Sequence, residues 1–348
     1  MDVIIIGAGA SGLMCAIEAA KRGRSVLVLD HANKAGKKIL MSGGGRCNFT
    51  NYTVEAENYL SENAHFCKSA LSRFTQWDFL AMVQDRAIAY HEREHGQLFC
   101  NESARDILNM LLDACHKAGV KIQLKTAISS IQKTVDQFTL QTETETLACE
   151  SLVVATGGLS IPKMGATPFG YQIAKQFGIA VTPTKAGLVP FTWLATDKEK
   201  FAHLSGLAMP VSLHYQDHHF TENLLFTHRG ISGPVVLQIS SYWQEGDSID
   251  IDLLPSMDLG QALHQAQKDK IKLKVSNYLA QFLPKKLLPL LLSAEVLDLF
   301  LLDLSHKQID LISEKIQQWK FKPNGTEGYR TAEATVGGVD CHAISSKT

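Results

Sequence analysis

Three glycines near the amino terminus, Gly7, Gly9 and Gly12, have the spacing of a turn that binds phosphate groups. They follow the apolar run Val3–Ile6 and precede a stretch of helical periodicity. In such a turn the first glycine permits the bend, the second lets a pyrophosphate approach the backbone, and the third lets the helix pack on the strand. The first N–H groups of the helix then face the phosphates. We therefore predict a dinucleotide-binding turn that uses Gly7, Gly9, Ala10, Ser11 and Gly12.

An acidic residue, Asp30, ends the next apolar run, Ser25–Leu29. A carboxylate at this position can accept hydrogen bonds from the two ribose hydroxyls of an adenosine. The turn and the carboxylate together do not distinguish a nicotinamide dinucleotide from a flavin dinucleotide.

A second glycine-rich segment, Ser42–Asn48, contains three consecutive glycines. Bare backbone lets a flat or anionic group approach main-chain N–H donors closely. Arg46 suits a phosphate or the negative charge of a reduced flavin. Cys47 has no partner in a Cys-x-x-Cys pair, so redox-active disulfide chemistry is not expected from the sequence. The predicted cofactor contacts of this region are Lys38, Ser42, Gly43, Gly44, Arg46, Cys47 and Asn48.

Several other polar groups are weaker candidates. His91 and His95 are four residues apart, but their polar surroundings favour a solvated turn over a metal site, and no metal site is expected. His228 lies in the segment Thr227–Pro234, where a substrate-side role and a structural hydrogen bond both remain open. The sequence has one concentration of basic residues, Lys268, Lys270, Lys272, Lys274, Lys285 and Lys286. We expect the alternate lysines to spread around a helix, and the group is either a solvated face or an RNA-backbone contact.

The composition of the 348 residues is that of a globular protein, with 45% hydrophobic and 20% charged residues. The net charge of -1 gives no global attraction to nucleic acid or to anionic membranes. The seven scattered cysteines favour a reducing cytosol, so we expect a cytoplasmic protein. The apolar stretch Leu287–Leu304 contains three acidic residues and predicts a buried helix pair, so no membrane contact is expected.

The elements that position these residues follow from hydrophobic periodicity. The order strand, glycine turn, helix (Ser11–Arg22) and strand is a β-α-β unit. Further along we predict a helix from Asn101 to Ala118, capped by Asn101 or Ser103. A strand at 120–124 follows, then an antiparallel meander formed by 128–132 and 137–142, and then another strand at 152–155. Short strands are predicted from about 188 to 252, and helices from 259 to 320.

Five segments resemble one known family in the same order along the chain. Ser42–Asn48, read as Ser-Gly-Gly-Gly-Arg-Cys-Asn, resembles the signature of the bacterial BaiN/RdsA-type (YhiN-like) flavoproteins, which are also called the aminoacetone oxidase family. The resemblance covers essentially the whole chain, since further motifs agree at Ala155–Gly158, Leu188–Pro190, Thr227–Pro234 and Ala332–Val339.

This resemblance implies an α/β fold of the two-dinucleotide type, a Rossmann-like FAD-binding domain with an inserted β-rich and helical substrate region. The expected domains are 1–187, completed by 323–348, then 188–258 and 259–322. The implied cofactor is FAD, with NAD(P)H as electron donor. Further implied cofactor contacts are His31, Ile128, Ala155, Thr156 and Gly157, and the catalytic candidates are Arg46, Cys47 and His228.

The resemblance also implies reduction of a carbon–carbon double bond. Our first hypothesis is conversion of uridine to dihydrouridine in large-subunit rRNA. The alternative is a small-molecule reductase or oxidase that acts on an unsaturated steroid-like substrate or an amino ketone. Members of the family continue beyond the position of Thr348 with a segment that holds the flavin, so an inactive, shortened flavoprotein is a third expectation. The sequence does not indicate an oligomeric state.

Overall fold

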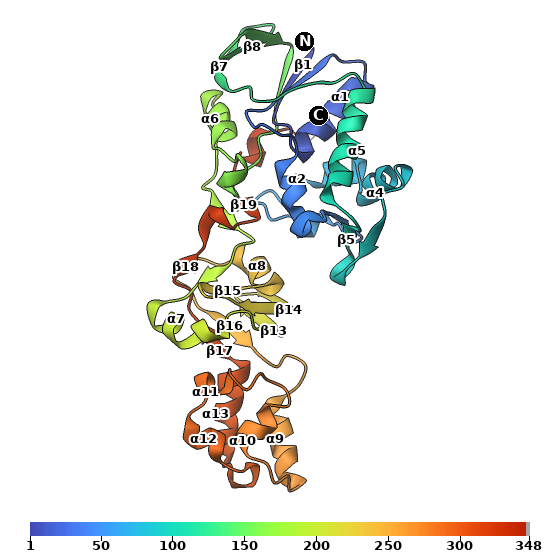
Figure 1. Ribbon diagram of the computed structural model, residues 1–348. Helices are drawn as coiled ribbons and strands as arrows, with labels where there is room; N and C mark the ends of the chain where they lie inside the picture. Colours follow the sequence, from blue (N-terminus) through green and yellow to red (C-terminus); the bar gives the residue numbers. More distant parts are fainter. Residues whose placement is uncertain (346–348) are drawn as a thin grey trace. The chain divides into compact units, whose positions relative to one another are not determined.

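The computed structural model describes residues 1–345 of the chain, which form two compact units (Figure 1). Unit 1 comprises Met1–Thr184 and the segment that begins at Gly337, and unit 2 comprises Lys185–Val336. The division into three domains with boundaries after residues 187, 258 and 322 stays a prediction. Residues 346–348, which end the segment predicted to complete the first domain, lie outside the described part of the chain.

Unit 1 is built on a four-stranded parallel sheet of order β10-β1-β2-β6. Its strands are β1 (Val3–Ile6), β2 (Val26–Leu29), β6 (Lys121–Gln123) and β10 (Ser151–Val154). Every residue of β1 and β2 is buried, as a central parallel strand covered on both faces requires. The predicted β-α-β opening is therefore confirmed, and it places the carboxyl ends of β10, β1 and β2 side by side.

Different layers cover the two faces of this sheet. On one face, Ile5 packs with Leu13 of α1 (Ala10–Lys21) and Ile107 of α5 (Ala104–Lys117). On the other face, Ile4 packs with Ile131 of a three-stranded antiparallel meander. That meander, which the alternating sequence pattern predicted, consists of β7 (Ile128–Lys133), β8 (Phe138–Thr142) and β9 (Thr146–Cys149), and α6 (Phe169–Gln176) lies on the same side.

The predicted boundaries of α5 are confirmed by its caps. The Ser103 hydroxyl accepts a hydrogen bond from the Arg105 N–H at 3.2 Å, and the helix ends just before Gly119, which has a φ of 77°. A small antiparallel sheet of order β3-β5-β4 adjoins this helix. Its strands are β3 (Asn48–Asn51), β4 (Tyr90–Glu92) and β5 (Gln97–Cys100), and the nearby helices are α2 (Lys37–Met41), α3 (Lys68–Arg73) and α4 (Gln76–Asp85).

Unit 2 contains a seven-stranded sheet of order β17-β16-β13-β14-β15-β12-β18, all of its pairs antiparallel. The strands are β12 (Phe191–Thr192), β13 (Ala208–Tyr215), β14 (His218–Phe226), β15 (Gly230–Ser232), β16 (Ile249–Asp252), β17 (Trp319–Phe321) and β18 (Gly325–Thr326). Unit 2 also contains the helices α7 (Ala195–Phe201) and α8 (Pro234–Ser240). A separate two-stranded antiparallel sheet is formed by β11 (Lys185–Gly187) and β19 (Ala334–Val336).

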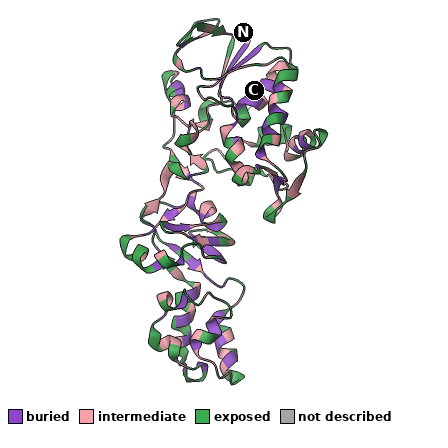
Figure 2. Cartoon of the chain, viewed as in Figure 1, coloured by how far each residue is buried: buried purple, intermediate pink, exposed green. Residues whose placement is uncertain are grey.

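Helices follow the strands of unit 2, as the periodicity predicts. They are α9 (Leu259–Lys268), α10 (Val275–Leu279), α11 (Leu288–Leu291), α12 (Ala294–Asp298) and α13 (His306–Gln317). The expected helical region extended to Lys320, but Trp319–Phe321 pairs with β16 instead. Buried residues of the sheet and the helices form one hydrophobic core, and Figure 2 shows the buried residues (purple) on the strands and on one side of the helices. Within the described residues, no helix has the length and hydropathy needed to cross a membrane.

Candidate functional site

The glycine turn between β1 and α1 is closed on one side and open on the other. A Cβ atom at Gly7 would lie 2.3 Å from the Ala155 carbonyl oxygen, and one at Gly12 would lie 1.9 Å from the Gly7 carbonyl oxygen. At Gly9, by contrast, no heavy atom lies within 4 Å of the Cβ position. Because α1 also begins without a side-chain cap, its first N–H groups are available to an external acceptor. This arrangement fits the pyrophosphate of a dinucleotide.

Asp30 holds the glycine turn in place from the end of β2. Its Oδ2 accepts a hydrogen bond from the Ala8 N–H at 2.8 Å, and its Oδ1 accepts one from the Ala32 N–H at 2.8 Å. Each carboxylate oxygen has a second lone pair, so the predicted ribose contact is compatible with these bonds. The Asp30 carbonyl in turn accepts from the Thr126 N–H at 2.9 Å, which brings the segment leading to Ile128 alongside Asp30.

The loop after β10 joins the same edge of the sheet. The Ala155 N–H donates to the Ile6 carbonyl at 2.8 Å, which continues the strand pairing up to the glycine turn. Beyond it, Gly157 has a φ of 72° and no heavy atom within 4 Å of its Cβ position, so this bend is also open. Further along the loop, a Cβ atom at Gly165 would lie 3.2 Å from Nε2 of the exposed His31.

The second glycine-rich segment, Ser42–Asn48, is tied to the first turn through α2. The N–H of Gly36, the residue before α2, donates to the Ala8 carbonyl at 2.8 Å. Gly43 and Gly44 have φ values of 59° and 65°, in the left-handed region that disfavours other residues. A Cβ atom at Gly43 would lie 2.7 Å from the Asn48 nitrogen, whereas the Cβ position of Gly44 has no heavy atom within 4 Å. Gly44 therefore presents bare backbone, as a cofactor contact requires.

Three side chains of this region differ in their exposure. Lys38 is exposed, and partial desolvation of its ammonium lowers its pKa. Arg46 is exposed and donates from Nη1 to the Asn101 carbonyl at 2.5 Å. Cys47 is only 4% exposed, and burial raises the pKa of its thiol although a hydrogen bond with Ser42 opposes the shift.

His228 lies in unit 2, on the loop between β14 and β15. Its side chain is exposed, while the glycines that follow it serve strand packing. A Cβ atom at Gly230 would lie 1.8 Å from the Phe191 carbonyl oxygen, and one at Gly233 would lie 2.4 Å from the Asn223 carbonyl oxygen. Neighbouring strands thus occupy the space beside both glycines. A substrate-side role of His228 stays a prediction.

His91 and His95 do not share a helical face. His91 lies in β4, where its Nδ1 is 2.8 Å from Oδ1 of Asn101, and His95 lies in the turn between β4 and β5. The lysine-rich segment also differs from expectation. Lys268 is the last residue of α9 and Lys274 directly precedes α10, and the connection between them begins with a turn in which Lys270 has a φ of 56°.

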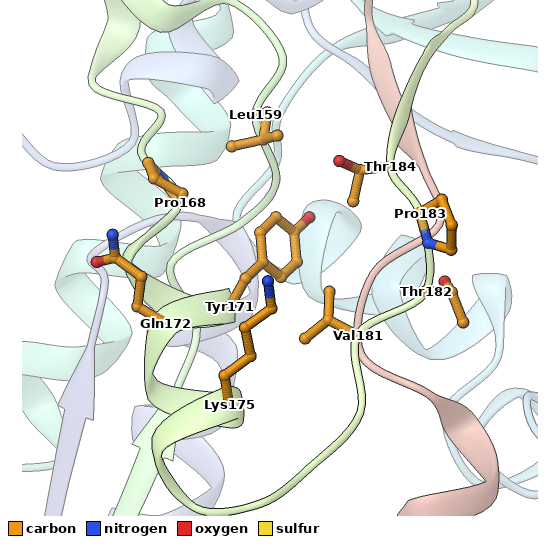
Figure 3. A pocket seen from close by; sticks show the side chains of 9 residues that line it. All are labelled: Leu159, Pro168, Tyr171, Gln172, Lys175, Val181, Thr182, Pro183 and Thr184. Atoms are coloured by element: carbon orange, nitrogen blue, oxygen red, sulfur yellow. The ribbon is translucent and has the colours of Figure 1, made fainter.

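Unit 1 also has an open cavity of about 410 Å³ that no sequence motif predicted (Figure 3). Helix α6 contributes Tyr171, Gln172 and Lys175, and the segment Val181–Thr184 contributes the opposite side. That segment is fixed by Thr182, whose N–H donates to the Gly338 carbonyl at 2.7 Å. The lining is completed by Leu159 and Pro168, which belong to the connection between the Ala155–Gly157 bend and α6.

Comparisons with known proteins agree with this geometry. Residues 1–348 match the family described as HI0933-like protein Rossmann domain. Two relatives are each named ribosomal RNA dihydrouridine synthase. The one from Escherichia coli K12 is 50% identical over 100% of this chain and 87% of its own length, and the one from Haemophilus influenzae is 51% identical over 99% and 87%. A more distant relative, a 3-dehydro-bile acid delta(4,6)-reductase from Clostridium scindens, is 26% identical over 96% of this chain and 86% of its own length.

Proposed function

Because the chain belongs to the HI0933-like Rossmann-domain family and is an FAD-dependent oxidoreductase, we propose that it reduces uridine to dihydrouridine in ribosomal RNA. One observation carries this proposal. Two relatives with that name are 50% and 51% identical over nearly the whole chain, including both glycine-rich segments. Dihydrouridine formation saturates a carbon–carbon double bond, which is the reaction class that the sequence resemblance implied.

The residues at the carboxyl edge of the parallel sheet are proposed to hold FAD, which supplies hydride chemistry when bound. The open backbone at Gly9 and the start of α1 would bind the pyrophosphate. Asp30 would bind the adenosine ribose, with Ile128 on the adenine side. The bare backbone at Gly44, with Arg46 beside it, would contact the flavin end. The remaining proposed contacts are Ala10, Ser11, His31, Lys38, Ser42, Gly43, Cys47, Asn48, Ala155, Thr156 and Gly157.

The electron donor is proposed to be NAD(P)H, and the proposed location is the cytoplasm, where rRNA is available. Arg46, Cys47 and His228 remain the candidates for groups that contact the reacting base. Of these, Arg46 and His228 are exposed, so each can reach an external substrate without a change in the protein core.

An exposed lysine-rich surface on the helical part of unit 2 supports an RNA substrate. In the connection between α9 and α10, which begins with a left-handed turn at Lys270, Lys270 and Lys272 are exposed, while Ile271 and Leu273 pack against the hydrophobic core. The lysine surface consists of Lys268, Lys270, Lys272, Lys285 and Lys286, all exposed and without an ion pair among the described residues. Lys274 is excluded because its Nζ pairs with Asp298 at 2.6 Å. Unpaired ammonium groups are suited to phosphate contacts.

A gene deletion tests the proposed reaction. The deletion strain should lose dihydrouridine from large-subunit rRNA, and the purified protein with FAD and NAD(P)H should restore it on rRNA from that strain. An intact dihydrouridine content in the deletion strain would contradict the proposal. In that case, turnover of an unsaturated steroid-like ketone would favour the small-molecule alternative, to which the Clostridium scindens relative points.

A further inference from the structure

Two cysteines that are distant in the sequence are neighbours in the small sheet of unit 1. Asn48 of β3 is paired with Phe99 of β5 in antiparallel register. Cys47 directly precedes β3, and Cys100, which follows Phe99, is the last residue of β5. The Cys100 N–H donates to the Arg46 carbonyl at 2.9 Å, which continues the strand contact past the paired residues.

The side chains of the two cysteines share one environment. Cys47 and Cys100 are free thiols, 4% and 0% exposed, and they belong to the same hydrophobic cluster. Burial raises the pKa of Cys100 to about 12, and the charge of a Cys47 thiolate acts in the same direction. The 2.9 Å hydrogen bond from the Cys100 N–H ends on the carbonyl of the peptide bond that joins Arg46 to Cys47, so the backbones of the two cysteines are in direct contact. A disulfide requires such proximity, with Cα atoms about 4.4–6.8 Å apart.

The two cysteines differ in their backbone surroundings. Cys47 has a φ of 50°, in the left-handed region, and it follows a run of three glycines with positive φ. The Cys47 N–H donates to the Ser42 carbonyl at 2.9 Å, so the loop folds back on itself at this point. Cys100, in contrast, is the last residue of β5 and adjoins the first turns of α5, which contribute Ala104 to the same cluster. One partner therefore lies in a glycine-rich loop and the other at the end of a strand.

We propose that Cys47 and Cys100 are a modification site, a dithiol that a hydroperoxide converts reversibly into a disulfide and thereby fixes the Ser42–Asn48 loop to β5. In the first step the Cys47 sulfur attacks the terminal oxygen of the hydroperoxide, which gives a sulfenic acid and an alcohol (water when the oxidant is hydrogen peroxide). In the second step the Cys100 sulfur attacks the Cys47 sulfur, a disulfide bond forms and water leaves. The two thiols lose two electrons, and the O–O bond is cleaved and accepts them. A dithiol reductant reverses the reaction by thiol–disulfide exchange.

The order of the two steps follows from exposure. Cys47 is the more accessible thiol and precedes Asn48 at the edge of the loop, so it meets the oxidant first, and the buried Cys100 acts as the resolving thiol. Because reaction requires a thiolate and both thiols are buried, oxidation is slow in the folded protein. An effect of the disulfide on FAD affinity rests on the proposed function, because it requires the Ser42–Asn48 loop to contact FAD.

The test is peptide mapping of the purified flavoprotein after treatment with hydrogen peroxide, with alkylation under denaturing, non-reducing conditions. The expected product is a peptide pair linked through Cys47 and Cys100 that dithiothreitol separates. In Cys100→Ser the Cys47 sulfenic acid should persist and react with dimedone, whereas in Cys47→Ser the Cys100 thiol should stay reduced. Cys341→Ser is the matched control, because Cys341 is the cysteine nearest the carboxyl end and outside this cluster, and its loss should leave the linked pair unchanged.

Two results would overturn the proposal. One is recovery of Cys47 and Cys100 as free thiols under conditions that oxidise Cys341, and the other is linkage of Cys47 to any other cysteine. A melting curve of each serine variant checks that the variant is folded, and Cys100→Ala replaces Cys100→Ser if the hydroxyl is not tolerated. Measuring the FAD affinity of the oxidised form distinguishes a failure of this proposal from a failure of the proposed FAD contacts. A disulfide with unchanged FAD affinity supports the dithiol and contradicts the contact between the loop and FAD.

Discussion

The Asp30 carboxylate accepts a hydrogen bond from the Ala8 N–H at 2.8 Å, so the acidic residue after β2 anchors the glycine turn after β1. Its other oxygen accepts from Ala32 at 2.8 Å, which fixes the start of the following loop. The residue predicted to bind a ribose is thus also part of the structure that shapes the turn proposed to bind the pyrophosphate. Substitutions at Asp30 should for this reason affect stability and FAD affinity together.

For Asp30→Ala, we expect the free energy of unfolding of the FAD-free protein to fall by about 1–3 kcal/mol, because two backbone N–H groups lose their acceptor. FAD affinity should fall as well. Urea denaturation and FAD titration measure the two effects separately. Asp30→Asn, which keeps one acceptor oxygen, should lose less stability than Asp30→Ala. A loss of FAD affinity at full stability would show that Asp30 acts on the ribose alone.

The two kinds of glycine in the first turn should respond differently to the same substitution. In Gly9→Val the side chain enters open space, so the protein should fold but lose FAD because the side chain occupies the pyrophosphate position. In Gly12→Val the Cβ atom would collide with the Gly7 carbonyl, so folding itself should fail. The flavin absorbance and the melting temperature of both variants test this. Stoichiometric FAD in Gly9→Val would refute the assigned pyrophosphate site.

If the lysine surface binds RNA phosphates, replacing Lys268, Lys270 and Lys272 with Gln should weaken rRNA binding. The slope of log K against log salt should flatten by roughly 0.7–0.9 for each phosphate contact that is lost. The control carries Lys307→Gln and Lys315→Gln, because both lysines are exposed on α13 and outside this surface. Binding isotherms at several salt concentrations give the slopes. Equal slopes for the triple variant and the unmodified protein would exclude these contacts, and FAD content should not change in either variant.

The reactivity of Cys47 should depend on pH in a direction set by its environment. Burial raises the pKa of this thiol above its ordinary value of 9.0, so at pH 8 the folded protein holds less thiolate than the unfolded chain. Alkylation of Cys47 by iodoacetamide should therefore be slower in the folded protein, and its rate should keep rising above pH 9. Quantitative mass spectrometry of Cys47 peptides from folded and urea-unfolded samples checks this. A folded-state rate that levels off below pH 9 would contradict the raised pKa.

The sequence by itself determined the elements whose signals are local. The run Val3–Ile6 forms a buried strand because β-branched side chains suit a sheet covered on both faces. The spacing of Gly7, Gly9 and Gly12 was sufficient to predict the turn, because the close contacts involved lie between adjoining elements. For α5 the sequence left Asn101 and Ser103 as alternative caps, and the structure shows that Ser103 is the cap. The family resemblance of the Ser42–Asn48 segment was likewise readable from residue types, and the family match over residues 1–348 confirms it.

Tertiary structure decided what depends on residues far apart in the chain. The helical pattern that was extended to Lys320 gives way at Trp319 because pairing with β16 satisfies the backbone of that segment. Lys270 and Lys272 are exposed while Ile271 and Leu273 pack against the core, because the helical pattern stops at a turn after α9, and charge spacing cannot reveal this. Cys47 has a thiol neighbour although the sequence contains no Cys-x-x-Cys pair. That neighbour, Cys100, is supplied by strand pairing across a long loop, and a register of this kind is set by the packing of both strands and cannot be derived from either strand alone.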